Sequence, residues 1–188
     1  QHVENPTESD LFQQFPKFFN DETAVTFLCD YIRLMTLGSD KAHEMETLMD
    51  EEIETHHNDQ LEISEAVNKA AEAMPALGIV AAVLGVIHTM GSITEPPEVL
   101  GHLIGAALVG TFLGVLLSYG FIGPMASALK GRANTDTKYF VCMKAGLMAY
   151  MQGYAPAVSV EFARKTLFAH ERPTFYDVED AVAELPAA

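Results

Sequence analysis

A stretch of 60 residues, from Ala70 to Leu129, contains no Lys and no Arg, although the chain has eleven of them. Two apolar runs fill most of this stretch: MPALGIVAAVLGVIHTM, from Met74 to Met90, and LIGAALVGTFLGVLLSYGFIGPM, from Leu103 to Met125. A helix needs roughly 20 apolar residues to cross a hydrocarbon core about 30 Å thick. We therefore expect two membrane-spanning helices that form a hairpin.

The alternative is a hairpin wholly buried inside a soluble protein. Helices on the surface of a soluble core carry a polar face, whereas neither apolar run contains Asp, Glu, Lys or Arg. A chain of 188 residues rarely covers two such helices on every side. The sequence therefore favours the membrane.

The residues that flank the two spans predict their orientation. The connecting segment contains Glu95 and Glu98 and no positive charge, whereas Lys69, Lys130 and Arg132 flank the opposite ends. Positively charged flanks tend to stay in the cytoplasm. We therefore expect both chain ends to be cytoplasmic and the connecting loop to face outward.

The chain is acidic, with a formal net charge of −15. Residues 1–69 hold most of this charge, with 16 acidic and 4 basic residues, whereas residues 130–188 hold 7 of each. An acidic surface argues against nucleic-acid binding and against adhesion to anionic lipid. It fits either a basic protein partner or simple solvation, and the composition leaves both open.

Helical patterns outside the spans predict an all-α membrane protein. Asp21 is expected to open a helix that ends at Gly38, and Ser39 is the expected cap of the next. No helix breaker lies between Ala42 and Pro75, so this helix is expected to run into the first span.

Beyond the second span, residues 131–137 are expected to be a turn or a loosened helix, and a last helix is expected over residues 175–185. The expected organisation has five parts. They are an acidic cytoplasmic helical domain (1–73), a transmembrane helix (74–90), an outward-facing loop (91–102), a second transmembrane helix (103–125) and cytoplasmic C-terminal helices (126–188).

Small residues in the second span predict close helix packing. Gly101 and Gly105, and again Gly110 and Gly114, stand four residues apart, a spacing that lets helix backbones approach closely. Spans this rich in small residues imply further helices around them. We therefore expect an oligomer, or further spans beyond these two.

Three other residues of the spans are candidates for function. The Thr111 hydroxyl either bonds the carbonyl four residues back or faces a pore, where it would solvate an ion or a water. Pro75 and Pro124 each remove a helix hydrogen bond, and mark either a boundary or a hinge. Neither span contains Asp or Glu. If protons cross here, the titrating carboxylate must come from a partner.

The sequence predicts no enzymatic chemistry, no cofactor and no metal site. His56 and His57 are adjacent, so on a helix they point about 100° apart and do not ligate a metal from one face. Cys29 and Cys142 lie in the expected cytoplasmic parts, where a structural disulfide is not expected. No convincing Ser-His-Asp, phosphate-loop or paired-carboxylate motif is present.

Six segments in one collinear order carry a resemblance to a known family. They are Glu4–Pro6 (ENP), Leu48–His56 (LMDEEIETH), Met74–Val86 (MPALGIVAAVLGV), Ala107–Pro124 (ALVGTFLGVLLSYGFIGP), Gly153–Pro156 (GYAP) and Val160–Pro173 (VEFARKTLFAHERP). With these segments the chain resembles the MotA-type flagellar motor stator subunits of the MotA/TolQ/ExbB proton channel family.

This resemblance implies a larger assembly in the bacterial cell inner membrane. Family members of this type have four spans, of which the two seen here would be the third and fourth. Five copies surround two copies of a MotB-like subunit, whose membrane Asp binds the proton. Ion passage drives the ring, which pushes on the rotor protein FliG. The matching segments include neither the first two spans nor the charged segment that contacts FliG. We therefore interpret the chain as a partial sequence of a functional stator subunit.

The resemblance also implies roles for particular residues. Pro75 and Pro124 match two family prolines that couple conformational change to torque, and Thr111 matches a hydroxyl that faces the ion path. Ala82 stands where sodium-driven relatives tend to carry Thr, which favours protons as the coupling ion. Glu51 and Glu52 fall in the acidic helix, where they are candidates for a rotor-facing surface.

Two other functions stay open from the sequence. One is an ExbB/TolQ-type energiser of outer-membrane transport, which shares the small-residue spans and the hydroxyl. The segments DEEIETH and EFARKTLF favour the flagellar motor over this alternative. The other is a passive membrane scaffold without ion flow.

Overall fold

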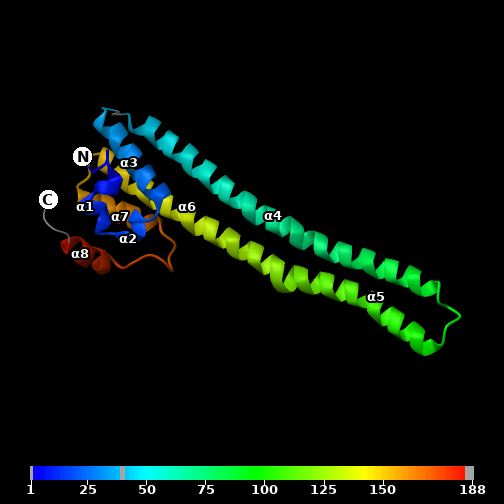
Figure 1. Ribbon diagram of the computed structural model, residues 1–188. Coiled ribbons are helices and arrows are strands. Elements are labelled where there is room, and N and C mark those ends of the chain that lie inside the picture. The colour runs from blue at the N-terminus through cyan, green and yellow to red at the C-terminus, as the bar shows by residue number, and fades with distance from the viewer. Residues whose placement is uncertain (1, 39–40, 185–188) are drawn as a thin grey trace. The chain divides into compact units, whose positions relative to one another are not determined.

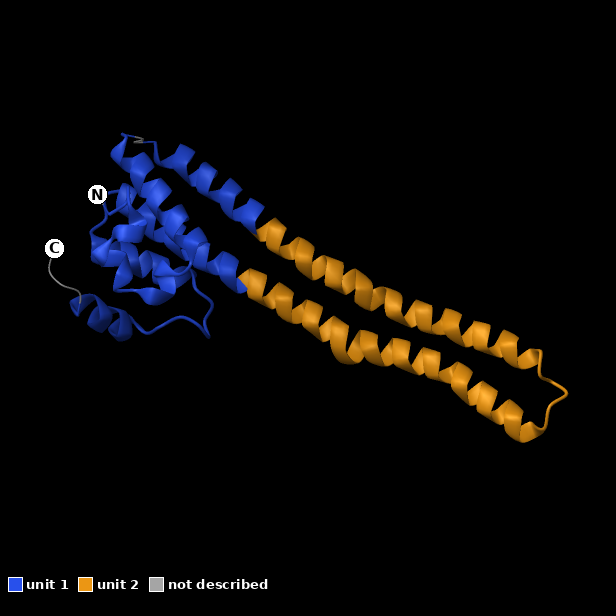
Figure 2. Cartoon of the chain, viewed as in Figure 1, with its two compact units in different colours: residues 1–56, 135–188 blue, residues 57–134 orange. Residues whose placement is uncertain are grey.

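The computed structural model describes residues 2–38 and 41–184, and every regular element in this part of the chain is a helix. The expected all-α fold is confirmed. Contacts divide the chain into two units, shown in Figure 2: unit 1 comprises residues 1–56 and 135–188, and unit 2 comprises residues 57–134. Two long helices, α4 (Ala42–Met90) and α6 (Gly123–Met151), each contribute to both units.

Unit 1 gathers the short helices of the chain around the first part of α4 and the last part of α6 (Figure 1). Its other elements are η1 (Pro6–Glu8), α1 (Asp10–Gln13), α2 (Pro16–Phe19), α3 (Glu22–Thr36), α7 (Pro156–Thr166) and α8 (Phe175–Ala183).

The two ends of α3 form where the sequence predicts them. The Asp21 carboxylate accepts a hydrogen bond from the Ala24 N–H at 3.0 Å, which satisfies one of the unpaired donors of the first turn. Gly38 follows the helix with a φ of +88°, a left-handed conformation that favours glycine. The expected cap at Ser39 lies outside the described residues.

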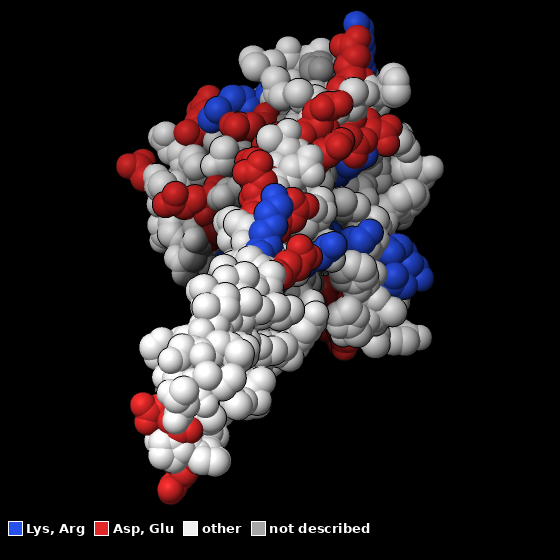
Figure 3. Space-filling model, turned by 90° about the vertical axis from the view of Figure 1, so that its right-hand side faces the viewer, with Lys and Arg blue, Asp and Glu red and all other residues white. Residues whose placement is uncertain are grey.

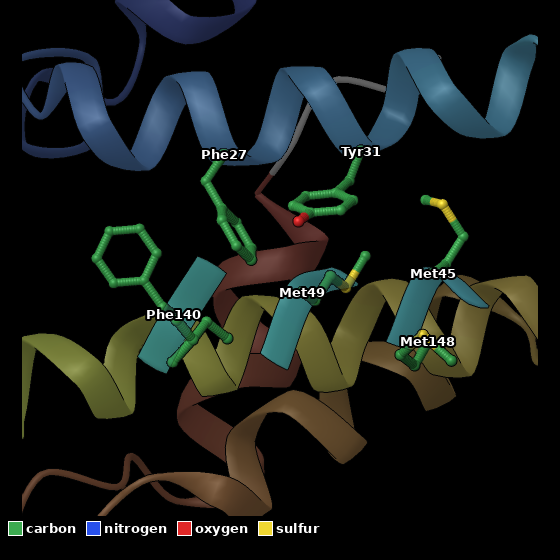
Figure 4. Close-up of a cluster of buried hydrophobic side chains, with 7 residues drawn as sticks. Phe27, Tyr31, Met45, Met49, Phe140 and Met148 are labelled. Carbon is green, nitrogen blue, oxygen red and sulfur yellow. The ribbon is translucent and has the colours of Figure 1, made fainter. Parts of the chain in front are cut away.

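A buried apolar cluster joins α3, α4 and α6 inside unit 1 (Figure 4). Phe27 packs edge-on against Phe140, with ring centroids 5.3 Å apart, and contacts the Tyr31 ring at 4.8 Å. Such aromatic pairs contribute about 0.5–1.5 kcal/mol each beyond the area they bury. The other members of the cluster are Met45, Met49, Ile53 and Met148. This core fixes the acidic first part of α4 against its neighbours.

Unit 2 is a helical hairpin made by the rest of α4, by α5 (Pro97–Leu117), by the π-helical turn η2 (Ser118–Ile122) and by the first part of α6. The prediction that one helix runs from Ala42 into the first span is confirmed, since α4 continues for 49 residues. It therefore crosses the expected boundary between residues 73 and 74 without a break.

The apolar surface of the hairpin is exposed. Only 11% of the most apolar stretch is buried in α4 and in the continuous helix Pro97–Met151, whereas the core helix of a soluble protein is mostly buried. In Figure 3 the projecting part of the hairpin is uncharged along its length and acidic at its tip, where the sequence places Glu95 and Glu98. Two helices of this length and composition fit a membrane location.

The expected turn at residues 131–137 is wrong, because α6 continues through this segment as a regular helix. Ala126, Ala133 and Phe140 are spaced seven residues apart and are only 3%, 1% and 4% exposed. This spacing keeps one face of α6 buried across the whole segment. The buried face therefore outweighs the helix-weakening effect of Gly131, whose missing Cβ meets nothing within 4 Å.

Candidate ion path and coupling elements

Glycines bring the two spans of the hairpin into direct backbone contact. A Cβ added at Gly114 would lie 2.6 Å from the Met74 carbonyl oxygen, and one added at Gly85 would lie 2.5 Å from the Ala107 Cβ. Real Cβ atoms essentially never approach that closely. Gly78 meets the Gly110 carbonyl oxygen in the same way, at 2.8 Å. The small residues thus let α4 and α5 pack backbone against backbone.

The other predicted glycine pair lies elsewhere on the hairpin surface. A Cβ added at Gly101 or Gly105 would meet nothing within 4 Å, and both glycines are exposed. Of the four glycines predicted to pack, Gly110 and Gly114 therefore approach α4, whereas Gly101 and Gly105 do not. That this second pair packs against further spans stays a prediction.

Thr111 is half-buried between the two spans. Its hydroxyl donates a hydrogen bond to the Gly78 carbonyl on α4, at 3.3 Å. The acceptor therefore lies on the other span and not at Ala107, four residues back on the same helix. The hydroxyl links the two helices at the level of the contact between Gly78 and Gly110.

Ala82 lies at the same level, one helical turn after Gly78. Its backbone nitrogen is 3.6 Å from the position of a Cβ added at Gly110. The structure thus brings the two predicted ion-path residues, Ala82 and Thr111, to the same contact between the spans. From residue 70 to residue 129 the only carboxylates are Glu72, Glu95 and Glu98, so the hairpin offers none near this level.

Pro75 lies inside α4, which continues through it. Because proline has no N–H, the helix lacks one hydrogen bond at this turn. The residue before it, Met74, is the one whose carbonyl oxygen faces Gly114. Pro75 therefore stands next to the close contact between Met74 and Gly114.

Pro124 follows a π-helical turn, which the sequence analysis did not predict. In η2 the Gly123 N–H donates to the Ser118 carbonyl, five residues back instead of four. A Cβ added at Gly123 would lie 2.9 Å from that same oxygen, so glycine suits this position. Such turns widen the helix by one residue and are frequent at functional sites. In the sequence, the close grouping of Gly120, Gly123 and Pro124 was the signal that could have indicated this irregular turn.

A buried serine ties the two long helices together just beyond Pro124. The Ser64 hydroxyl donates to the Ala126 carbonyl at 2.9 Å, and Ser64 is only 4% exposed. Both residues belong to unit 2. No sequence signal identifies Ser64, because one serine in a polar helix has no distinctive spacing.

The acidic segment of α4 is partly engaged inside unit 1. The Tyr31 hydroxyl donates to the Glu52 carboxylate at 2.6 Å, and Tyr31 is only 2% exposed. Burial, and then the hydrogen bond to Glu52, raise the pKa of the Tyr31 phenol, so it stays a neutral donor. Glu51 is exposed. The two predicted rotor-facing residues thus differ, because Glu52 also holds α3 against α4.

A second contact joins α4 to α6. The Lys144 ammonium lies 2.6 Å from the Asp50 carboxylate and 3.4 Å from that of Glu46, and its side chain is 15% exposed. Because Glu46 and Asp50 are paired with Lys144, fewer carboxylates of the acidic segment are unpaired than the sequence alone suggests. Among the described residues, no group of three His, Cys, Asp or Glu side chains is placed to hold a metal ion.

Residues 21–141 match the sequence profile of the MotA/TolQ/ExbB proton channel family. The match covers more than half of the chain, which therefore belongs to this family of membrane proteins.

Within the family, the chain is similar to proteins of bacterial motility. It is 44% identical to Motility protein A of Escherichia coli (strain K12), over 96% of this chain and 61% of that protein. It is 35% identical to the chemotaxis protein LafT of Vibrio parahaemolyticus, over 97% of this chain and 64% of that protein. The chain thus spans less than two thirds of the length of these relatives.

Solved structures show the same fold. The chain superposes on the flagellar MotAB stator complex of Bacillus subtilis with a TM-score of 0.69 and 28% identity, over 83% of this chain and 58% of that one. It superposes on MotAB of C. jejuni with a TM-score of 0.73, over 92% of this chain and 66% of that one. At 18% identity, the second likeness supports the fold alone.

Proposed function

We propose that this chain is part of a stator subunit of the bacterial flagellar motor. With a MotB-like subunit it would form a proton channel and convert proton flow into torque on the rotor protein FliG. The observation that carries this proposal is the 44% identity to Motility protein A over 96% of the chain. Membership of a proton channel family supports a transport role. We propose that this role involves no cofactor and no enzymatic step.

The proton path uses a partner's carboxylate. Because the hairpin has no Asp or Glu near Thr111, the proton-binding Asp comes from the MotB-like subunit. The Thr111 hydroxyl faces that path, where it solvates the proton or a water that carries it. Ala82 lies beside Thr111 and has no hydroxyl, so the path lacks a second hydroxyl at this level. Because sodium-driven relatives tend to carry Thr at this position, protons are the coupling ion in this proposal.

The coupling elements are Pro75 and the turn before Pro124. Protonation of the partner's Asp changes the contacts of the hairpin. Each span then bends at its proline, where the helix already lacks one backbone hydrogen bond. Bending at these points moves the cytoplasmic helices, whose acidic residues Glu51 and Glu52 face the rotor.

The assembly is a homo-oligomer, a pentamer around the MotB-like subunits, in the bacterial cell inner membrane. Both ends of this chain are cytoplasmic, and the segment between the spans faces outward. Lys69, Lys130 and Arg132 at the inner ends of the spans support this orientation. The acidic cytoplasmic segment binds protein and not nucleic acid.

Complementation tests the proposal. The full-length parent gene is expressed in a flagellated strain that lacks its own stator subunit, and swimming is measured. Restored swimming supports the stator function. Paralysed cells that insert the protein at normal levels would contradict it.

The alternative is an ExbB/TolQ-type energiser of outer-membrane transport, which belongs to the same family. It is tested by uptake through an energy-dependent outer-membrane transporter in a strain that lacks its energiser. Rescue of uptake without rescue of swimming would establish this alternative. Loss of motility without any change in proton conductance, when the chain is removed or inactivated, would instead indicate a passive scaffold.

A further inference from the structure

A buried hydrogen bond joins the two arms of the hairpin on the inner side of both prolines. The Ser64 hydroxyl on α4 donates to the Ala126 carbonyl on α6 at 2.9 Å, and these residues are only 4% and 3% exposed. Ala126 follows Pro124 by two positions, and Ser64 precedes Pro75 by eleven. The proposed function so far assigns no role to this bond.

The Thr111 hydroxyl makes a second bond between the arms, on the other side of the prolines. It donates to the Gly78 carbonyl at 3.3 Å. Along the chain, Gly78 follows Pro75 in α4, and Thr111 precedes Pro124. Both prolines and the π-helical turn therefore lie between two hydrogen bonds that join the arms. The section that can bend is thus held at each end.

The position of Ser64 in the packing follows a seven-residue repeat. Ser64, Ala71 and Gly78 are all buried and stand seven residues apart on α4. This spacing keeps one helix face against a neighbouring helix. Ala71 and Gly78 have no polar side chain, so small apolar residues suffice for close packing in this row. Ser64 adds a hydrogen bond, which is directional and therefore fixes where α6 lies along α4.

The facing row of buried residues contains one extra residue at the π-helical turn. Ala126 and Ala133 are buried seven residues apart, whereas the preceding buried residue, Ser118, lies eight residues before Ala126. The turn η2, which begins at Ser118, accommodates the extra residue. It therefore determines which carbonyl of α6 faces Ser64, and a change in this turn acts directly on the bond.

We propose that Ser64 is a positioning residue of the stator, which transmits the movement of the second span at Pro124 to α4. When the section with the prolines bends, the bond to Ala126 makes α4 follow α6. Since α4 is one continuous helix from Ala42 to Met90, it carries this movement to Glu52, twelve residues before Ser64. The inference rests on the proposed function and names the contact through which bending at Pro124 reaches the acidic segment.

Torque and proton flow, measured on the same variants, test this role. In the full-length parent protein, Ser64→Ala removes the hydroxyl and Ser64→Thr keeps it. Torque per stator unit is measured from the speed steps of bead-labelled motors as units join, and proton conductance is measured in the same strains. Ser64→Ala is expected to keep the parent's conductance and number of speed steps, with less torque at each step. Ser64→Thr is expected to retain both torque and conductance.

The matched control is Thr89→Val, which removes another buried hydroxyl from α4. Thr89 is 5% exposed, but its hydroxyl donates to the Gly85 carbonyl of the same helix, at 2.9 Å. This variant is expected to keep the parent's torque per unit, because it breaks no bond between the arms.

Three results would overturn the inference while the unchanged parent gene restores swimming. They are full torque per unit from Ser64→Ala, a fall of torque and conductance in the same proportion, and an equal loss of torque in Ser64→Thr or Thr89→Val. The second would show a role in folding or in the path, and the third would show that the hydroxyl bond between the arms is not what matters. Failure of the unchanged parent gene to restore swimming would instead contradict the proposed function, and the inference with it.

Discussion

The Thr111 hydroxyl and the Ala82 amide meet at one acceptor, the carbonyl oxygen of Gly78. Thr111 donates to it from α5 at 3.3 Å, and the helical ladder of α4 brings the Ala82 N–H to the same oxygen. The two residues assigned to the ion path from the sequence thus converge on a single backbone group. A change at Thr111 therefore acts on the contact between the spans and, under the proposed function, on the proton path as well.

Replacing Thr111 with Val keeps the shape of the side chain and removes its hydroxyl. Hydrogen bonds between membrane helices contribute about 0.6 kcal/mol on average, so the variant is expected to insert and assemble. Proton flow and torque are expected to fall, because the path loses its hydroxyl. The matched variant Thr111→Ser keeps the hydroxyl and is expected to retain most of the flow. Unchanged proton conductance in Thr111→Val would show that the hydroxyl serves packing alone.

Adding a methyl group at Gly85 is expected to push the two spans apart. The new Cβ would lie 2.5 Å from the Ala107 Cβ and 2.9 Å from the Ala107 Cα, and the backbone of α5 cannot yield cheaply. Overpacking of this kind typically costs about 1–3 kcal/mol. Gly131→Ala, where a Cβ meets nothing within 4 Å, is the control and is expected to be neutral or stabilising. The measurement is the melting temperature of each purified protein, and equal values for the two variants would contradict the packing described.

Deleting Gly120 tests the π-helical turn as the flexible point of the second span. A π-turn holds one extra residue, so its loss is expected to restore a regular α-helix while both flanking segments keep their faces. The variant should assemble but fail to rotate the motor. Deleting Val109, in the regular part of α5, shifts all residues on one side by about 100° and is expected to prevent assembly. Full motility after deletion of Gly120 would rule out a role for the turn.

The sequence predicted the features that depend on composition and local chemistry. The two spans follow from apolar runs without charge, the cap at Asp21 from its side chain, and the end of α3 from Gly38. The expected turn or loosened helix at residues 131–137 was wrong, because the prediction considered local helix propensity and not the buried face that contains Ala126 and Ala133. Tertiary burial overrides propensity at such positions.

Contacts between residues far apart in the chain left no local signal. Ser64 and Ala126 are separated by 62 positions, and Tyr31 and Glu52 by 21. Each pair is brought together by the packing of long helices, which spacing within one helix does not specify. Glu52 was placed correctly in an acidic helix, but its bond to Tyr31 depends on the position of α3.

The bond between Tyr31 and Glu52 is expected to stabilise unit 1. Removing the hydroxyl with Tyr31→Phe should cost about 1.5 kcal/mol, as for other hydrogen bonds to a charged group. Lys144→Met, which removes more exposed ion pairs, should cost less than about 1 kcal/mol. Thermal unfolding of the purified variants measures both, and a larger loss for Lys144→Met would contradict this ranking.

The same bond gives a pH dependence of known sign. Burial, and secondarily Glu52, raise the pKa of Tyr31 above its ordinary value of 10.0, so the folded state favours the neutral phenol. The resulting stability is complete below that ordinary value and is lost as the pH rises through the higher pKa of the folded state. Glu52→Gln should lower the pKa of Tyr31, as measured by tyrosinate absorbance with Tyr31→Phe as the reference. An unchanged titration would contradict the assigned role of Glu52.

Rotation of single motors tests the central claim most directly. The full-length parent gene, with and without Pro124→Ala, is expressed in a paralysed strain, and beads attached to flagella are followed while the proton gradient is collapsed and the sodium gradient is kept. We predict rotation that stops with the proton gradient, and no rotation with Pro124→Ala despite normal assembly. Rotation that survives loss of the proton gradient, or full torque from the Pro124→Ala protein, would contradict a proton-driven stator coupled through this proline.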